Sequence, residues 1–567
     1  MVKKIFVFPF LLAFPLYFIS CSRGESNIVV FYTNDIHGYM QKDLSYASVA
    51  QMKIDSTLKG NHTFLVDIGD HISGSIYASY DKGETVVETM NLADYDCSTI
   101  GNHEFDYPIS YLKEIMQKAN YKYLSCNFYH ADDQGNPTYR FTDGSMILNA
   151  GDVNIGFVGI TTPECLSISG EEYFKGYTFL SKDNMFYEEV QKEVNYLKES
   201  CKYVIALAHL GIDEKGRQFS SKTLAKNTSG LDVIIDGHSH HYVEKSIVKN
   251  KDNKDVIITQ MGEYFEKVGK LTIHKNSQID VETITSYPNK SYVVNEFVKS
   301  YVTKIEDIYG GDVGYSNINF EKMDGISEKP LGDLAADSFY YDLNYGRDKE
   351  SNGCDFTIVN CGGVRSNIKP GKWTGLTCKE IFVFNNGAGI KSVPGQTIRT
   401  LLEFMVRRIN KKEKVWFGGF MQVCGIKFDV DENITSDIVE DENGNYISGP
   451  TKDHYKVSNI QIYDKGEDKY KDFDESDNYL VGGSIYPLNG GDGCTMLKDI
   501  ELTYAKTDIE DYKILCDYIE SFEKEYIPTE KKELSVIATD KCELKKYDPN
   551  IGFNYENPFG GSRIQIK

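Results

Sequence analysis

The sequence lacks the positive charge that binding to a nucleic-acid polymer requires. Its 567 residues include 62 Lys and Arg against 84 Asp and Glu, which gives a formal net charge of −22. Phosphate backbones are bound by basic surfaces, so we expect no nucleic-acid polymer among the partners. A small anionic substrate is not excluded, because metal ions and a few arginines reverse the field locally.

Long hydrophobic runs are also missing. The apolar stretch 5–19 follows two lysines, is interrupted by two prolines, and is shorter than the ~20 residues that span a membrane. It is typical of a secretory signal, and Cys21 resembles a bacterial lipoprotein cleavage site. We therefore expect residues 1–21 to be a signal peptide or lipoprotein signal. The protein would be secreted, periplasmic or at the cell surface. Either its signal is cleaved without lipidation, or the chain is lipid-anchored through Cys21.

The twelve cysteines would suggest disulfides in a secreted chain. Four of them lie in segments that resemble buried strands or tight turns: Cys97, Cys126, Cys361 and Cys424. A small buried thiol is the simpler interpretation of those four.

The length favours two domains, because a single hydrophobic core stops growing at about 250–300 residues. Short apolar runs at 28–32, 64–66, 204–207 and 233–235 read as buried strands, and 184–200 has helical spacing. This alternation predicts a layered α/β domain. A second part begins near Pro330, where 331–345 favours a helix and new strand–turn units follow.

Polar side chains follow the predicted strands and would gather at one edge of the sheet. Seven of them are Asp, Asn or His: Asp35, His37, Asp70, Asn102, His209, His238 and His240. One such residue is usually structural, whereas the ordered set predicts a metal centre. Two divalent cations need a bridging carboxylate with imidazoles and further oxygens, and together they activate water and stabilise phosphoryl charge. Mixed nitrogen and oxygen ligands suit Zn, Mn, Fe or Co without choosing among them.

Five segments carry a resemblance to a known family: TNDIHG (33–38), DIGD (67–70), GNHEFD (101–106), AHLG (208–211) and GHSH (237–240). The set resembles the calcineurin-like metallophosphoesterases, and within them the secreted 5′-nucleotidase/UDP-sugar hydrolase family. The resemblance implies a four-layer α/β sandwich domain followed by a smaller α/β substrate-binding domain. It implies Asp35, His37 and His240 on one metal, Asn102, His209 and His238 on the other, and Asp70 as the bridge. The family often has Gln or Asn at the position of His240.

The resemblance also implies that His103 and Asp106 form a catalytic dyad. Asp106 lies three residues beyond His103, so it could orient the imidazole and favour its protonated form. A cationic His103 would stabilise the transition state. The alternative is that His103 only supports its metal-binding neighbour.

The case for a nucleotide substrate rests on the C-terminal half. The segment 360–365 resembles a glycine-rich family loop, and Arg365 offers a planar fork of donors to phosphate. The resemblance implies a second phosphate-binding arginine at Arg408, two base-stacking aromatic side chains and a ribose-binding carboxylate. The implied substrate-binding set is Asn360, Arg365, Arg408, Phe420, Tyr486 and Asp492.

These expectations combine into one function. We expect a two-metal phosphohydrolase that releases phosphate from nucleoside 5′-monophosphates by attack of metal-bound water or hydroxide. The alternatives are UDP-sugar or nucleotide pyrophosphatase activity, 2′,3′-cyclic-nucleotide phosphodiesterase activity, and a non-catalytic nucleotide-binding surface protein. The expected divisions are a catalytic domain at 26–328, a linker helix at 329–347, a substrate-binding domain at 348–550 and a tail at 551–567. The resemblance implies that the second domain turns about the linker helix and that its closure delivers the substrate.

Overall fold

The computed structural model describes most of the chain. The described residues are 26–168, 174–212, 218–316, 319–346, 353–411, 415–441, 444–451, 454–467, 469–521, 525–526, 534–535 and 563–567. The expected signal, Cys21 and most of the expected tail lie outside these residues. Within them, no helix is long and apolar enough to cross a membrane.

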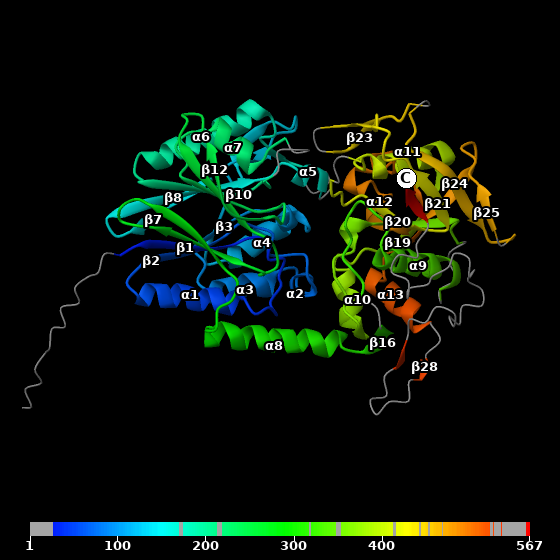
Figure 1. The fold of residues 1–567 in the computed structure, drawn as a ribbon, viewed down its shortest axis with the longest axis horizontal. Helices are drawn as coiled ribbons and strands as arrows, with labels where there is room; N and C mark the ends of the chain where they lie inside the picture. The colour runs from blue at the N-terminus through cyan, green and yellow to red at the C-terminus, as the bar shows by residue number, and fades with distance from the viewer. Residues whose placement is uncertain are drawn as a thin grey trace, which may run out of the picture.

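The N-terminal part contains two six-stranded sheets (Figure 1). The first has the order β15 (Ile279–Ile284), β14 (Val268–Ile273), β1 (Ile28–Thr33), β2 (His62–Asp67), β3 (Cys97–Thr99) and β4 (Lys122–Leu124). The second has the order β12 (Tyr242–Lys249), β13 (Asp255–Met261), β11 (Val233–Asp236), β10 (Tyr203–His209), β8 (Val153–Thr161) and β7 (Ser145–Ala150). Strands β1 to β4 are parallel, as are β8, β10, β11 and β13.

The central strands of both sheets are buried on two faces, which explains their continuous apolar runs. Val30 and Leu207 meet in the core between the sheets, whereas Val29 turns to the helices outside. Four helices cover the first sheet: α1 (Tyr46–Leu58), α3 (Glu84–Leu92), α4 (Ile109–Lys118) and α8 (Tyr292–Tyr309). Helices α6 (Asp183–Lys198) and α7 (Ser221–Asn227) cover the second. The predicted four-layer sandwich is confirmed.

Shorter elements complete the N-terminal part. They are α2 (Ile76–Ser79), β5 (Phe128–Ala131), β6 (Pro137–Arg140), α5 (Cys165–Ile168) and β9 (Tyr177–Phe179). The four cysteines expected to be buried thiols are buried, and no disulfide joins the cysteines of the described ranges.

The C-terminal part is built around a five-stranded sheet. Its order is β20 (Met421–Cys424), β17 (Phe356–Asn360), β26 (Asn478–Ser484), β19 (Ala388–Pro394) and β27 (Leu502–Lys506). A second sheet has the order β25 (Lys469–Asp472), β24 (Val457–Asp464), β21 (Ile426–Val430) and β30 (Ile564–Ile566). The helices are α9 (Pro330–Tyr345), α10 (Gly375–Ile381), α11 (Gly395–Val406), α12 (Ile485–Leu488) and α13 (Asp511–Glu520). The remaining strands are β16 (Asp312–Ser316), β18 (Gly371–Thr374), β22 (Val439–Glu440), β23 (Tyr446–Ser448), β28 (Glu525–Tyr526) and β29 (Leu534–Ser535).

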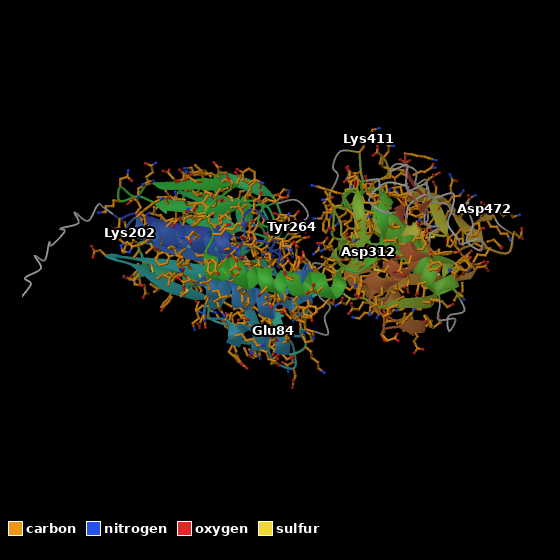
Figure 2. The ribbon with its side chains drawn as sticks, turned by 90° about the horizontal axis from the view of Figure 1, so that it is seen from below. Glu84, Lys202, Tyr264, Asp312, Lys411 and Asp472 are labelled. Carbon is orange, nitrogen blue, oxygen red and sulfur yellow. The ribbon has the colours of Figure 1, made fainter. Side chains whose placement is uncertain are left out.

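Two helices, α9 and α8, can be compared with the linker helix expected at 329–347. Helix α9 fills most of that range, and it packs against β17, β20 and β26 inside the C-terminal core. Helix α8 instead packs on α1 and α3 at one end and on α10 at the other. Figure 2 shows α8 running from beneath the N-terminal part toward Asp312, with Tyr264 on the side that faces the C-terminal part. The helix that stands between the two parts is therefore α8, and the expected domain boundaries remain predictions.

Candidate metal centre

The seven predicted metal ligands lie at the carboxyl ends of strands from both sheets. Asp35 and His37 follow β1, Asp70 follows β2, and Asn102 follows β3. On the second sheet, His209 ends β10, and the two histidines of GHSH follow β11. Because the two sheets pack face to face, residues more than 200 positions apart in the sequence meet at this edge.

The backbone at this edge is strained. Five of the seven residues have φ between 52° and 77°, a region that side chains other than glycine rarely adopt: Asp35, His37, Asp70, His238 and His240. Each such residue costs of the order of 1–3 kcal/mol, and such strain clusters at functional sites. The lack of a side chain at Gly101 leaves space for the Asp70 carboxylate, since a Cβ there would lie 2.3 Å from Asp70 Oδ1.

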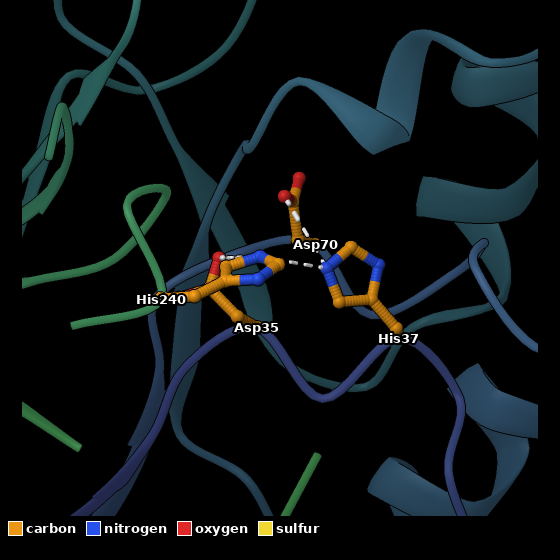
Figure 3. A group of neighbouring side chains, drawn as sticks. All are labelled: Asp35, His37, Asp70 and His240. Atoms are coloured by element: carbon orange, nitrogen blue, oxygen red, sulfur yellow. Dashed lines mark hydrogen bonds and ion pairs between the residues drawn. The ribbon is translucent and has the colours of Figure 1, made fainter. Parts of the chain in front are cut away.

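The side chains form two groups that share one carboxylate, and Figure 3 shows the first of these groups. Asp35, His37, Asp70 and His240 offer ligand atoms that lie within 4.8 Å of one another, and so do Asp70, His209 and His238. Asn102 joins the second group, because its Oδ1 lies 2.6 Å from His238 Nδ1 and 3.1 Å from His209 Nε2. The structure brings all seven predicted residues together, with Asp70 in both groups.

The outer nitrogen of each of the four imidazoles meets an oxygen acceptor. His37 Nδ1 lies 3.0 Å from Ser73 O, and His209 Nδ1 lies 2.7 Å from Ile68 O. Carboxylates are the acceptors for the other two imidazoles, since Glu164 Oε2 is 2.8 Å from His238 Nε2 and Glu263 Oε2 contacts His240 Nδ1. Acceptors at these positions fix the tautomer and leave the inner nitrogen with a lone pair.

This arrangement fits divalent cations. His37 Nε2 and His240 Nε2 face each other at 3.2 Å, so two neutral rings would oppose their lone pairs. A proton shared between the two rings is disfavoured, because burial and the nearby His103 hold the pKa of His37 well below its usual range. Burial also raises the pKa of Asp35 to about 6, partly offset by His240 and His209. A cation among these donors would accept the opposed lone pairs of His37 and His240 and would stabilise the Asp35 carboxylate.

A buried glutamate anchors the loops that carry the ligands. The Glu104 carboxylate accepts hydrogen bonds from the backbone N–H groups of Asp70 (2.8 Å), His71 (2.9 Å) and Gly101 (2.6 Å). This role was not predicted from the sequence, although a charged residue inside the GNHEFD segment was a usable signal. Glu164 and Glu263 were not predicted either, because no local pattern marks them.

The two residues of the predicted dyad are in contact. His103 Nδ1 lies 2.8 Å from Asp106 Oδ2, which also accepts a hydrogen bond from Ser73 Oγ. Burial lowers the pKa of His103, but the carboxylates of Asp106 and Asp70 more than offset this, so the pKa lies above its usual value. On its other side, His103 Nε2 lies 3.0 Å from a guanidinium nitrogen of Arg365. The two halves of the chain therefore meet at His103.

The other predicted substrate-binding residues divide into two sets. Asn360 Nδ2 donates to Asp492 Oδ2 at 2.7 Å, and Tyr486 Oη lies 3.3 Å from Asp492 Oδ1. Arg408 instead donates to Glu440 at 3.3 Å, and within the described residues no hydrogen bond or ion pair joins it to Asn360 or Asp492.

The prediction that Phe420 stacks on a base does not agree with the structure. Its side chain is 0% exposed and belongs to the C-terminal core, so neither face of the ring is open to a ligand. The apolar pattern around Phe420 did not distinguish a core residue from a binding one.

Two aromatic residues that we did not predict lie close to predicted site residues. Phe384 stacks on His103 at 6.1 Å between ring centroids and lies 5.1 Å from the Arg365 guanidinium carbon. Trp416 is 55% exposed, and a Cβ on Gly418 would lie 3.1 Å from its ring and 3.7 Å from Asp492 Oδ1. The only signal for Trp416 was its place just before the Gly-Gly turn at 418–419.

Comparison with known proteins agrees with this architecture. Residues 28–242 match the calcineurin-like phosphoesterase family, and residues 312–499 match the 5′-nucleotidase C-terminal domain. The fold and the clustered ligands define a metallophosphoesterase. The chain belongs to the 5′-nucleotidase family of calcineurin-like metallophosphoesterases, and it is a metal-dependent phosphoric ester hydrolase.

Individual relatives have low sequence identity to this chain, but the similarity extends over most of its length. The trifunctional nucleotide phosphoesterase protein YfkN of Bacillus subtilis is 25% identical over 80% of this chain, which spans 33% of that protein. The snake venom 5′-nucleotidase of Gloydius brevicauda is 24% identical, with 92% of this chain and 91% of that protein covered. The crystal structure of a 5′-nucleotidase precursor from Thermus thermophilus has the same fold, with a TM-score of 0.72, 22% identity, and coverage of 95% and 99%.

Proposed function

We propose that the protein releases phosphate from nucleoside 5′-monophosphates, with two divalent cations held by Asp35, His37, Asp70, Asn102, His209, His238 and His240. The observation that carries this proposal is the contact between Arg365 and His103. Through it, the loop beside Asn360 and Asp492 faces the metal-binding edge of the sandwich. The names of the relatives support a nucleotide substrate.

Bound divalent cations would supply electrostatic stabilisation of the charge that develops on the phosphoryl oxygens, and would promote ionisation of the attacking water. Zn, Mn, Fe and Co all accept this mixture of nitrogen and oxygen donors. Asp70 is the one carboxylate common to both groups of ligands within the described residues, so we assign it the bridging position.

Arg365 and His103 are placed to hold the phosphate. Their nitrogens converge at 3.0 Å, so a phosphate oxygen entering between them would accept a hydrogen bond from each. Asp106 fixes the ring of His103 through Nδ1 and leaves Nε2 directed at the substrate. A proton on Nε2 then stabilises the transition state and can pass to the leaving nucleoside oxygen.

The nucleoside would be bound by groups around Asp492. Its carboxylate, already in contact with Asn360 and Tyr486, can accept hydrogen bonds from ribose hydroxyls. With Phe420 buried, we assign base stacking to the partly exposed Tyr486 and the exposed Trp416. Stacking of this kind tolerates any base.

A substrate panel tests the proposal. Substrate loss and products are measured by chromatography with AMP, ATP, UDP-glucose and 2′,3′-cAMP, each with and without chelator; AMP should give adenosine and phosphate, UDP-glucose would give UMP and glucose 1-phosphate, and 2′,3′-cAMP would give an adenosine monophosphate. We expect AMP to give the highest kcat/KM. A higher value with UDP-glucose or with 2′,3′-cAMP would instead establish the pyrophosphatase or the cyclic phosphodiesterase alternative, which the name of the trifunctional relative keeps in view. The non-catalytic alternative is set aside because the chain belongs to a hydrolase family.

A further inference from the structure

His240 is the most exposed of the four clustered histidines. Its side chain is 25% exposed, whereas those of His37 and His209 are fully buried and that of His238 is 7% exposed. The rings of His37 and His209 are also held by backbone carbonyls. His240 therefore depends more than they do on a side-chain partner for its orientation.

That partner is Glu263, in the loop between β13 and β14. Its carboxylate contacts His240 Nδ1, which keeps the proton on Nδ1 and the Nε2 lone pair directed at the cluster. On that side, Nε2 lies 3.2 Å from His37 Nε2 and 3.6 Å from Asp35 Oδ1. A carboxylate placed in this way is a recurrent means of orienting a histidine ligand.

Glu263 is itself held by a lysine from the other half of the chain. Lys322 Nζ lies 3.3 Å from Glu263 Oε1 and 3.5 Å from Oε2. It also lies 3.4 Å from Tyr264 Oη and 5.2 Å from the centre of that ring. The backbone N–H of Lys322 donates to Asn367 Oδ1 at 2.5 Å, two residues beyond Arg365. A continuous set of contacts thus joins His240 to the Arg365 loop.

We propose that Glu263 is a positioning residue for His240, and that Lys322 holds Glu263 in place from the part of the chain that carries Arg365. Binding of a cation at Asp35, His37, Asp70 and His240 then depends on the placement of the C-terminal part. The inference rests on the proposed cation site and extends it, since Glu263 and Lys322 are not among the ligands.

The test measures metal binding directly. Metal-free wild type, Glu263→Ala, Glu263→Gln and Lys322→Met are titrated with Mn²⁺ or Co²⁺, and bound metal is counted by elemental analysis. We expect two equivalents in the wild type, with one of them weakened about 10–100-fold by Glu263→Ala. Glu263→Gln keeps an acceptor and should lose less, and Lys322→Met should weaken the same equivalent. The visible spectrum of the Co²⁺ protein should change in each variant.

A matched pair elsewhere provides the control. Lys270 Nζ and Glu282 Oε1 are 3.1 Å apart on β14 and β15, away from the cluster, so Lys270→Met and Glu282→Gln should bind metal as the wild type does. Circular dichroism of the metal-free proteins shows whether each variant is folded. If Glu263→Ala does not fold, the comparison is made with Glu263→Gln instead. Wild-type affinity and an unchanged Co²⁺ spectrum in Glu263→Gln and Lys322→Met would overturn the inference. Failure of the wild type to bind metal would instead overturn the proposed function.

Discussion

At the scale of single residues, His103 is engaged on both ring nitrogens by groups that arrive from different parts of the chain. Asp106 holds Nδ1, and Arg365 approaches Nε2. We expect His103→Ala to lower kcat by about 10²–10⁴-fold with a small change in KM, because a positioned proton donor acts mainly in the transition state. Initial rates with AMP measure this.

Asp106→Asn is the companion variant, and it should lose less because the ring remains in place. A His103→Ala enzyme whose kcat stays within about twofold of the wild type would show that His103 only supports Asn102.

The aromatic residues of the C-terminal part give a second prediction. Trp416→Ala should raise KM for AMP about tenfold or more while sparing an aryl phosphate, because base stacking is worth about 1–3 kcal/mol. Phe420→Ala should instead lower the free energy of unfolding by about 3–5 kcal/mol, as loss of a buried ring does. Steady-state kinetics and urea unfolding separate the two effects. Equal losses of Trp416→Ala on both substrates would contradict a stacking role.

That the seven predicted metal ligands would cluster could be anticipated from the sequence, because each lies at a strand end and has a characteristic neighbour. His37 and His238 belong to short motifs whose order is informative. Glu164 and Glu263 could not, because each acts on a histidine from a distant loop and has no motif of its own. Phe420 shows the converse, since its motif suggested binding whereas packing buries it.

At the scale of elements, the C-terminal strand β30 is fastened by a buried ion group. Arg563 Nη2 lies 2.9 Å from Asp337 Oδ1, and Nη1 lies 3.7 Å from Asp333 Oδ1, both on α9. We expect Arg563→Met to lower the free energy of unfolding by about 3–5 kcal/mol, because it leaves two buried carboxylates without their cation. Urea unfolding measures this.

Two further variants control this experiment. Lys567→Met, at the exposed end of the same segment, should change stability by no more than about 1 kcal/mol. Adding Asp333→Asn and Asp337→Asn to Arg563→Met should restore part of the loss. A stable Arg563→Met protein would mean that the ion group does not hold β30.

Helix α10 carries a titratable group that gives a pH-dependent prediction. Burial raises the pKa of Glu380 to about 7, and Lys42 from the N-terminal part offsets only a little of this. The folded protein then keeps a proton that the unfolded chain loses near pH 4.5, so its stability falls as the pH rises from 4.5 to about 7. The effect is at most about 3 kcal/mol.

Glu380→Gln should remove this dependence. In urea unfolding, the variant should match the wild type near pH 4.5 and exceed it about one pH unit above the raised pKa, whereas the exposed Glu501→Gln should follow the wild type at both. A Glu380→Gln protein with no gain at the higher pH would contradict a half-buried Glu380 that stays neutral.

At the scale of the whole molecule, the layered architecture was predictable because strands buried on both faces leave long apolar runs. The run at 28–32 became β1, and the helix expected at 184–200 became α6. The identity of the helix between the two parts was not predictable in this way. Both α8 and α9 have helical patterns, and only the packing of α9 inside the C-terminal core separates them.

Metal removal tests the central claim most directly. Protein stripped with a chelator is assayed for phosphate release from AMP while Mn²⁺, Zn²⁺, Fe²⁺ or Co²⁺ is returned and bound metal is counted. We predict that activity disappears in the stripped protein and returns in proportion to the binding of two equivalents of metal. In the Asp70→Ala variant, returned metal should restore neither the activity nor the binding of two equivalents. Full activity in protein that retains a negligible fraction of one equivalent of metal would contradict the account.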